Sequence, residues 1–293
     1  MAAAVAAVAI GCSPAAESVP ASQARVDRGA PLPETTGGAR AAGGQRTLGE
    51  VLVDEGLRYG DGGSIDVYRT SAGDHRLVVV FIDDQSDRSQ YADLAVALAR
   101  SGVVVAVADY RPELAAADSG CVVDAALAHV ATVAQAASEV ALVGFGLGGA
   151  VATGQSLGGP WRWWSPSPGC RATIHELEPQ SLITISGEFD AFSPGADRTL
   201  HGLSPYDQLE GNPYVRIRLV VGSGDEPVTV DSTQRFHAAL QGAKYDSRVE
   251  VVSGPSGTPV GFGAGEGAMG DPPVVGTLAE IILAALHGEL RSN

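Results

Sequence analysis

One stretch, residues 139–153, constrains the fold of this chain more than any other. It reads Glu-Val-Ala-Leu-Val-Gly-Phe-Gly-Leu-Gly-Gly-Ala-Val-Ala-Thr. An apolar, β-branched run that enters a glycine turn and leaves as small helix-forming residues is typical of a buried parallel strand, a tight elbow and a helix. The stretch therefore predicts a strand in the interior of a sheet, followed directly by a helix.

Two motifs compete for the turn. One is the nucleophile elbow G-x-S-x-G, in which Gly144 and Gly148 match and Gly146 stands where the serine would be. The other is the G-x-G-x-x-G of dinucleotide-binding folds, which Gly144, Gly146 and Gly149 satisfy. The two motifs imply different chemistry, so the surrounding chain must decide between them.

From Thr47 onward the chain alternates strand-like and helix-like segments. The predicted strands are 51–59, 64–70, 76–82, 103–108, 140–143, 181–186, 215–221 and 248–252, and the predicted helices include 91–101, 122–137, 228–241 and 277–287. This order predicts one α/β domain over 47–293, with a mostly parallel sheet of about eight strands and helices on both faces. Segments around 158–180 and 190–213 have little periodicity and are expected to form a cap or insertions.

The position of the elbow argues against dinucleotide binding. A dinucleotide site lies in the first βαβ unit and has an acidic residue about 20 residues past the glycines. Here the glycines follow the fifth predicted strand. The stretch where the acidic residue would stand reads Trp163-Trp164-Ser165-Pro166, which contains no acidic residue and does not resemble the end of a strand. Dinucleotide binding is therefore kept only as a minor alternative, and we expect no cofactor.

The order of elements resembles the α/β-hydrolase fold over nearly the whole chain after residue 47. The elbow carries this resemblance together with four other segments: Ser-Ile-Asp-Val-Tyr-Arg at 64–69, Val-Ala-Val-Ala-Asp-Tyr-Arg-Pro at 105–112, Ser-Gly-Glu-Phe-Asp at 186–190, and Val-Gly-Ser-Gly-Asp at 221–225. In order and spacing they look like a bacterial carboxylesterase of the lipase/esterase type. The resemblance implies ester hydrolysis by a serine nucleophile, an acid, a histidine and an oxyanion hole.

Three of these four functional elements are altered. The nucleophile position is Gly146, which has no side chain, and Thr258 occupies the most plausible position for the histidine. The strand that should lead into an oxyanion-hole His-Gly leads into Asp83-Asp84, which places carboxylates where negative charge would develop. Only the acid position is retained, at Asp225. We therefore expect a non-catalytic relative of carboxylesterases, a binding or scaffold module whose elbow is kept for the fold because glycine accepts the turn freely.

An active hydrolase with rearranged catalytic residues is the alternative. His175 and His201 fall in the loop and insertion that could cover the cleft, so they are the candidates for a relocated base. Ser156 and Ser165 are available hydroxyls, although their neighbours do not resemble an elbow. A hydroxyl within hydrogen-bond reach of a histidine at the cleft would favour this alternative.

Acidic and aromatic residues are the candidates for binding. Ligands of open α/β sheets lie beyond the carboxyl ends of the strands, where Asp83, Asp84 and Asp190 are expected together with Asp109 and Asp225. Such carboxylates suit a cation or an ammonium group, but they are also common as loop acids and helix caps that never converge, and we assign no metal site. The three tryptophans, at 161, 163 and 164, indicate either an aromatic lip for a ligand, partner or membrane interface, or the core of a small cap.

Net charge limits the partners. The chain carries 19 basic and 34 acidic residues, for a net charge of −15. Nucleic-acid binding needs a positive face, so no nucleic-acid partner is expected. The expected partner is an unidentified small-molecule or protein ligand.

The N-terminus predicts export. Ala9-Ile10-Gly11-Cys12 resembles a bacterial lipobox, so residues 1–11 are interpreted as a lipoprotein signal peptide, Cys12 as the lipidated residue and 12–46 as a flexible tether. The chain would then be anchored to the outer face of the bacterial cell membrane, and Cys121 and Cys170 would be able to form a disulfide. The alternative is a cytoplasmic protein with an alanine-rich tail and an incidental cysteine.

Overall fold

A computed structural model describes residues 44–59, 63–71, 76–109, 115–133, 137–158, 178–192, 204–254, 257, 260–262, 269 and 271–288. These residues belong to one compact unit, Arg40–Asn293. Several of the predicted site residues lie outside the described residues: Cys12, Trp161, Trp163, Trp164, Cys170, His175, His201 and Thr258.

Three antiparallel strands open the fold: β1 (Gln45–Leu48), β2 (Val51–Tyr59) and β3 (Gly63–Arg69). Alternate residues of β3 are buried, which is the pattern predicted for a strand that covers a core with one face. A two-residue turn joins β1 to β2, with Leu48 paired to Val51 and Gly49 at φ 63°. Strand β1 lies partly inside the segment interpreted as a tether, because its exposed polar residues resemble linker sequence.

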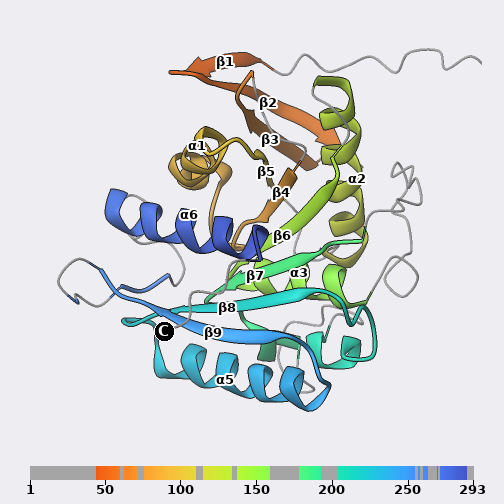
Figure 1. Cartoon of the computed structure of the whole chain (residues 1–293), viewed down its shortest axis with the longest axis vertical. Helices are drawn as coiled ribbons and strands as arrows, with labels where there is room; N and C mark the ends of the chain where they lie inside the picture. The colour runs from red at the N-terminus through yellow and green to blue at the C-terminus, as the bar shows by residue number, and fades with distance from the viewer. Residues whose placement is uncertain are drawn as a thin grey trace, which may run out of the picture. The chain divides into compact units, whose positions relative to one another are not determined.

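Six further strands complete a nine-stranded sheet, one strand more than the approximate number predicted. They are β4 (Arg76–Phe81), β5 (Val104–Ala108), β6 (Glu139–Phe145), β7 (Ser181–Ile185), β8 (Arg216–Gly222) and β9 (Ser247–Val252). The strand order is β1-β2-β3-β5-β4-β6-β7-β8-β9, and all pairs from β5 to β9 are parallel. This mostly parallel sheet confirms the predicted α/β class, and it places β4 in the middle of the strand order with β6 beside it (Figure 1).

Helices cover both faces of the sheet. They are α1 (Ala92–Arg100), α2 (Ala115–Val133), α3 (Leu147–Leu157), α5 (Pro227–Gly242) and α6 (Pro272–Leu286), with short 3-10 turns η1 (Arg88–Tyr91), η3 (Phe189–Phe192) and η4 (Pro205–Gln208). Helix α1 packs against α6, and α2 packs against α3 on the other side of the sheet (Figure 1). The elbow therefore lies in the interior of the domain, as its apolar flanks predict.

Two further observations concern the predicted anchor and disulfide. Within the described ranges, no helix combines the length and the apolar character needed to cross a bilayer. Cys121, in α2, is disulfide-bonded, and its partner lies outside the described residues. Pairing of Cys121 with Cys170 therefore stays a prediction.

Candidate functional site

The elbow joins β6 to α3 through a single residue, Gly146. Its backbone is at φ 50° and ψ −121°, a conformation that a residue with a Cβ adopts only under strain. Its N–H donates to the carbonyl of Ile185, at the end of β7, over 3.0 Å, and its carbonyl accepts from the Glu188 N–H over 3.0 Å. The elbow is thus part of the hydrogen-bonding of the sheet, which explains why the turn is kept.

The neighbouring glycines let strand and helix approach closely. A Cβ atom at Gly144 would lie 2.6 Å from the Gly149 Cα, and one at Gly148 would lie 2.8 Å from the Phe81 carbonyl carbon. Both distances are shorter than real Cβ contacts. The glycines therefore serve the packing of β6, β4 and α3, which accounts for them without phosphate binding.

Asp83 fills the space beside the elbow. It lies two residues beyond the end of β4 and is 5% exposed. Its Oδ1 accepts a hydrogen bond of 3.2 Å from the N–H of Leu147, the first residue of α3. A Cβ atom at Gly146 would lie only 2.7 Å from the Asp83 Cγ, so the carboxyl group occupies the place of a side chain at the elbow.

This hydrogen bond occupies the N–H that follows the predicted nucleophile position, Gly146. In a nucleophile elbow, the N–H of the residue after the nucleophile is one of the donors that hold the developing oxyanion. Here that N–H belongs to Leu147 and already binds a carboxyl oxygen of the same chain. The sequence predicts carboxylates at residues 83 and 84, and the structure shows that Asp83 Oδ1 is the atom that accepts the Leu147 N–H.

Burial is the main influence on the charge of Asp83. Burial raises the pKa of the carboxyl group above its ordinary value. The hydrogen bond from Leu147 lowers this pKa, and the charge of the nearby Asp84 raises it, so that the net shift is upward. The Asp83 N–H donates to the Tyr91 hydroxyl over 3.3 Å, and burial raises the pKa of that hydroxyl. The ring of Tyr91 packs edge-on against Phe145, with centroids 4.8 Å apart. Asp83 is thereby held to the end of β6 through Tyr91.

Asp225, the retained acid position, is the acceptor of three hydrogen bonds. Its Oδ2 accepts from the Gly222 N–H over 2.7 Å and from the Ser186 hydroxyl, and its Oδ1 accepts from the Phe262 N–H over 2.7 Å. These donors come from the end of β8, the end of β7 and the segment after β9. The carboxylate therefore joins three segments at the carboxyl edge of the sheet, which is a structural use of the residue.

Ser186 is a residue that the sequence reasoning missed. It follows β7, is 4% exposed and has φ 49°, a left-handed conformation that favours glycine. Its N–H donates to the Val220 carbonyl over 2.8 Å, and its hydroxyl donates to Asp225. The segment 186–190 contributed to the family resemblance, but no sequence signal marked Ser186 as a partner of Asp225.

Two histidines of the described residues contact side chains that are not predicted site residues. His129 Nε2 lies 3.0 Å from Asp54 Oδ2 on β2, and His237 Nδ1 lies 3.0 Å from the Ser247 hydroxyl at the start of β9. His287 is the C-cap residue of α6. Among described residues, no hydrogen bond joins a histidine to Gly146, Ser186 or Asp225.

The predicted acidic cluster is only partly brought together. Asp190 accepts from the Tyr206 hydroxyl over 3.4 Å and forms an ion pair with Arg235 on α5, whereas Asp109 lies at the far side of β4, at the end of β5. Asp83 and Asp84 are adjacent, and the charge of Asp84 contributes to the raised pKa of Asp83. In the part of the chain that is described, no group of three or more histidine, cysteine or acidic side chains could hold a metal ion.

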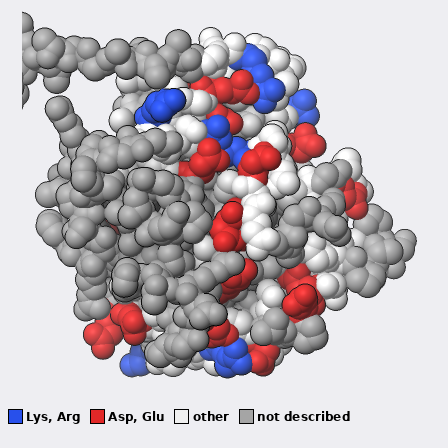
Figure 2. Space-filling view, turned by 180° about the vertical axis from the view of Figure 1, so that it is seen from behind, with Lys and Arg blue, Asp and Glu red and all other residues white. Residues whose placement is uncertain are grey.

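The surface carries the excess of acidic residues that the net charge requires. On the face turned away from the view of Figure 1, acidic side chains extend down the described surface, and basic side chains gather toward its upper and lower ends (Figure 2). The described part of this face shows no continuous positive area of the kind that phosphate backbones need (Figure 2).

Comparisons with known proteins show which fold this is. No family model matches the sequence, and no curated protein matches it. Among solved structures, the chain is similar to esterase 2 of Thermogutta terrifontis phosphoramylated by tabun, with a TM-score of 0.59 and 17% identity over 85% of this chain and 98% of that chain. It is also similar to esterase B from Lactobacillus rhamnosis, with a TM-score of 0.64 and 14% identity over 83% of this chain and 88% of that chain.

The protein therefore has the α/β-hydrolase fold, and the resemblance to bacterial esterases is confirmed at the level of the fold. At identities of 14–17%, this likeness establishes the fold alone. Within this fold, the chain has a glycine at the turn from β6 into α3 and a carboxyl group against the first N–H of α3.

Proposed function

We propose that this chain is a non-catalytic α/β-hydrolase-fold protein that serves as a binding or scaffold module. The observation that carries the proposal is the position of Asp83, whose carboxyl group fills the place of a side chain at Gly146 and accepts the Leu147 N–H. The fold is that of an esterase, and the place where an esterase does its chemistry is occupied by the chain itself.

Two requirements of ester hydrolysis, a nucleophile and a free oxyanion donor, are opposed at this place. A nucleophile needs a side chain, and Gly146 has none. An oxyanion needs free donors, and removal of a single donor from an oxyanion hole costs about 10²–10³ in kcat. Here the Leu147 N–H is engaged, and the partner group is a carboxyl, which repels the negative charge of a tetrahedral intermediate whenever it is ionised.

The acid position supports the same proposal. In a catalytic triad, the acid accepts a hydrogen bond from the histidine and holds its ring in place. Asp225 instead accepts from Ser186, Gly222 and Phe262, so its retention is explained by the fold. The ligand of the module is an unidentified small molecule or protein, and the acidic surface makes a nucleic acid a poor partner.

Export and lipid anchoring at Cys12 form a second part of the proposal, supported by the lipobox-like Ala9-Ile10-Gly11-Cys12. Metabolic labelling with a radioactive fatty acid should label the full chain, and Cys12→Ser should abolish the label and release the protein from the membrane fraction. A membrane fraction that carries no labelled protein would instead favour the cytoplasmic alternative.

The alternative function is hydrolysis by rearranged residues. The retained elbow geometry and the esterase-like fold favour it, and the candidate bases His175 and His201 lie outside the described residues. Both proposals share the fold and differ in whether a base reaches the cleft.

Turnover of short activated esters separates the two functions. The purified chain should hydrolyse p-nitrophenyl acetate and p-nitrophenyl butyrate no faster than the Ser186→Ala variant or a heat-denatured sample. Turnover above these controls that is lost in His175→Ala or His201→Ala would contradict the non-catalytic proposal and identify the relocated base.

A further inference from the structure

Residues 83–91 connect Asp83 to a network of ion pairs at the antiparallel end of the sheet. The segment leaves β4, reaches η1 and returns toward its own start, because the Asp83 N–H donates to the Tyr91 hydroxyl over 3.3 Å. The Ser86 N–H donates to the Asp83 carbonyl over 3.1 Å. These bonds make the segment a folded strap with Asp83 at one end and η1 at the other.

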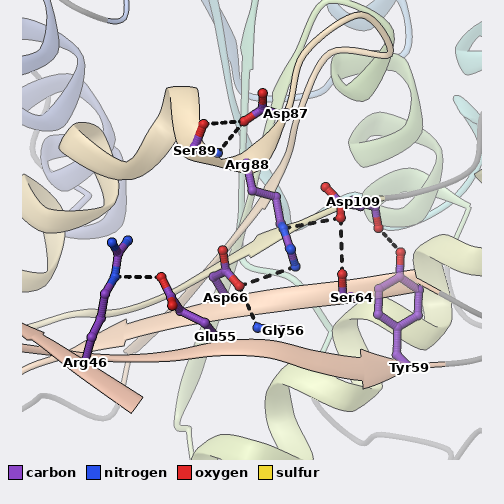
Figure 3. A network of polar contacts seen from close by, with 10 residues as sticks. All are labelled: Arg46, Glu55, Gly56, Tyr59, Ser64, Asp66, Asp87, Arg88, Ser89 and Asp109. Atoms are coloured by element: carbon purple, nitrogen blue, oxygen red, sulfur yellow. Dashed lines mark hydrogen bonds and ion pairs between the residues drawn. The ribbon is translucent and has the colours of Figure 1, made fainter. Parts of the chain in front are cut away.

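Arg88 anchors the η1 end of the strap. One of its terminal nitrogens lies 3.3 Å from Asp66 Oδ1 on β3, and its Nε lies 3.2 Å from Asp109 Oδ2 at the end of β5 (Figure 3). The Arg88 side chain is 19% exposed and that of Asp66 is 13% exposed. The two ion pairs hold η1 against two neighbouring strands. The pair with Asp66 is largely buried, which makes it stronger than a pair in open water, whereas the Asp109 side chain is 43% exposed.

Both carboxylates of this anchor are held in turn by the strands. The Gly56 N–H donates to Asp66 Oδ1 over 2.8 Å, and the Ser64 hydroxyl donates to Asp109 Oδ2 over 3.2 Å (Figure 3). Burial raises the pKa of Asp109 and outweighs the lowering by the charge of Arg88, so the net shift is upward. The anchor is therefore an arranged site and not a chance surface pair.

We propose that residues 83–91 are a strap that blocks ligand binding at the elbow, in which Arg88 is the positioning residue that holds the Asp83 carboxyl against the Leu147 N–H. This inference rests on the proposed loss of catalysis at Gly146, and it adds the cause of the occlusion. The strap fixes Tyr91 against Phe145, Tyr91 fixes the Asp83 backbone, and the Asp83 side chain fills the place beside Leu147.

The strap makes the elbow an anion site that is occupied from within. The N-terminus of α3 offers the Leu147 N–H and the positive end of the helix dipole, which together favour a carboxylate. Asp83 supplies that carboxylate from the same chain, at an effective concentration that a free acid in solution cannot match. Withdrawal of Asp83 should therefore expose a site for a small carboxylate, the group that also forms when an ester is cleaved.

Hydrogen exchange at the Leu147 amide tests the anchor in the ¹⁵N-labelled full chain. In Arg88→Gln, this amide should exchange about tenfold faster than in the wild type, because its hydrogen bond to the Asp83 carboxyl is broken more often. Arg88→Lys, which keeps the charge, should restore part of the protection. Arg69→Gln is the matched control, since Arg69 is partly buried, pairs with Asp54 over 3.4 Å and belongs to β3. Exchange in Arg88→Gln equal to that of the wild type would overturn the strap.

Titration with sodium butyrate tests the occlusion. The Leu147 amide resonance should move with butyrate in Asp83→Ala, and it should stay fixed in the wild type and in Asp83→Asn, which keeps an oxygen against the N–H. A resonance that is unmoved in Asp83→Ala, or that moves equally in all three proteins, would overturn the proposal. Neither readout uses turnover, so ester hydrolysis by the wild type would refute the proposed function without deciding this test.

Discussion

Asp83 and Gly146 share one place in this molecule: the carboxyl group of Asp83 fills the space that a side chain at residue 146 would need. A Cβ at Gly146 would lie 2.7 Å from the Asp83 Cγ, and the Asp83 Oδ1 binds the Leu147 N–H over 3.2 Å. The two residues are far apart in the sequence, and the parallel pairing of β4 with β6 brings them together.

Gly146→Ser should not create an esterase. The new side chain would have to displace Asp83, and its Cβ would add about 1–3 kcal/mol of strain at φ 50°. We expect no turnover of p-nitrophenyl acetate and a lower melting temperature, measured by calorimetry. Adding Thr258→His should restore some turnover only if Asp83 is also replaced by glycine. Full activity from the single serine would show that a base already reaches the elbow.

Asp83→Asn should change the pH dependence of stability. The native pKa of Asp83 is raised, so between the ordinary value of 3.8 and the native value the folded chain holds a proton that the unfolded chain has released. The contribution of Asp83 to stability therefore falls as the pH rises through this window. In urea unfolding, we expect the free energy of unfolding of Asp83→Asn minus that of the wild type to be more positive at pH 8 than at pH 4.

A neighbouring residue provides the control of opposite sign. The hydrogen bonds from Ser89 lower the pKa of Asp87, so its stabilising effect is present above the ordinary pKa and is lost as the pH falls. For Asp87→Asn, the free energy of unfolding minus that of the wild type should therefore be more negative at pH 8 than at pH 4. An equal effect of Asp83→Asn at both pH values would contradict the assigned shift.

Asp225→Ala should destabilise the fold strongly. The substitution leaves the Ser186 hydroxyl and the N–H groups of Gly222 and Phe262 without their acceptor, which should lower the free energy of unfolding by about 3 kcal/mol or more. Asp231→Ala, at an exposed pair with Arg235 on α5, should cost about 0.5 kcal/mol or less. Chemical denaturation measures both, and similar small losses would show that Asp225 is not a structural centre.

Two substitutions at Ser186 separate backbone strain from hydrogen bonding. Ser186→Ala removes the hydroxyl that donates to Asp225 but keeps a Cβ at φ 49°, so it should cost about 1.5–3 kcal/mol. Ser186→Gly loses the same hydrogen bond but relieves about 1 kcal/mol or more of strain. Glycine should therefore be the more stable variant in denaturation experiments, and the reverse order would argue against strain at this position.

The parts of the fold that the sequence predicts are those with a strong local pattern. The valine-rich runs of β4, β5 and β6 are buried along nearly their whole length, and such runs indicate parallel strands whatever the rest of the chain does. Strand β1 lacks this pattern because it is an exposed edge strand. Helix α2 begins at Ala115, before the predicted start at 122, because Gly120 interrupts the helical pattern that the sequence presents.

The site could be predicted in its residue types but not in its contacts. Glycine at 146 and carboxylates at 83 and 84 follow from the alignment of motifs along the chain. The hydrogen bond from Leu147 to Asp83 depends on how closely β4 approaches α3, and the positive φ of Ser186 depends on its tertiary surroundings. The ion pairs of Arg88 likewise join three segments that are distant in sequence.

The central claim is that no activated nucleophile exists at this elbow, and a serine-reactive fluorophosphonate tests it most directly. Intact-mass spectrometry of the full wild-type chain after incubation should show no added phosphonyl group under conditions that label a bacterial esterase to completion. An adduct that forms on the native chain but not on a chain denatured before the incubation, mapped to any serine or threonine by peptide sequencing, would contradict the account.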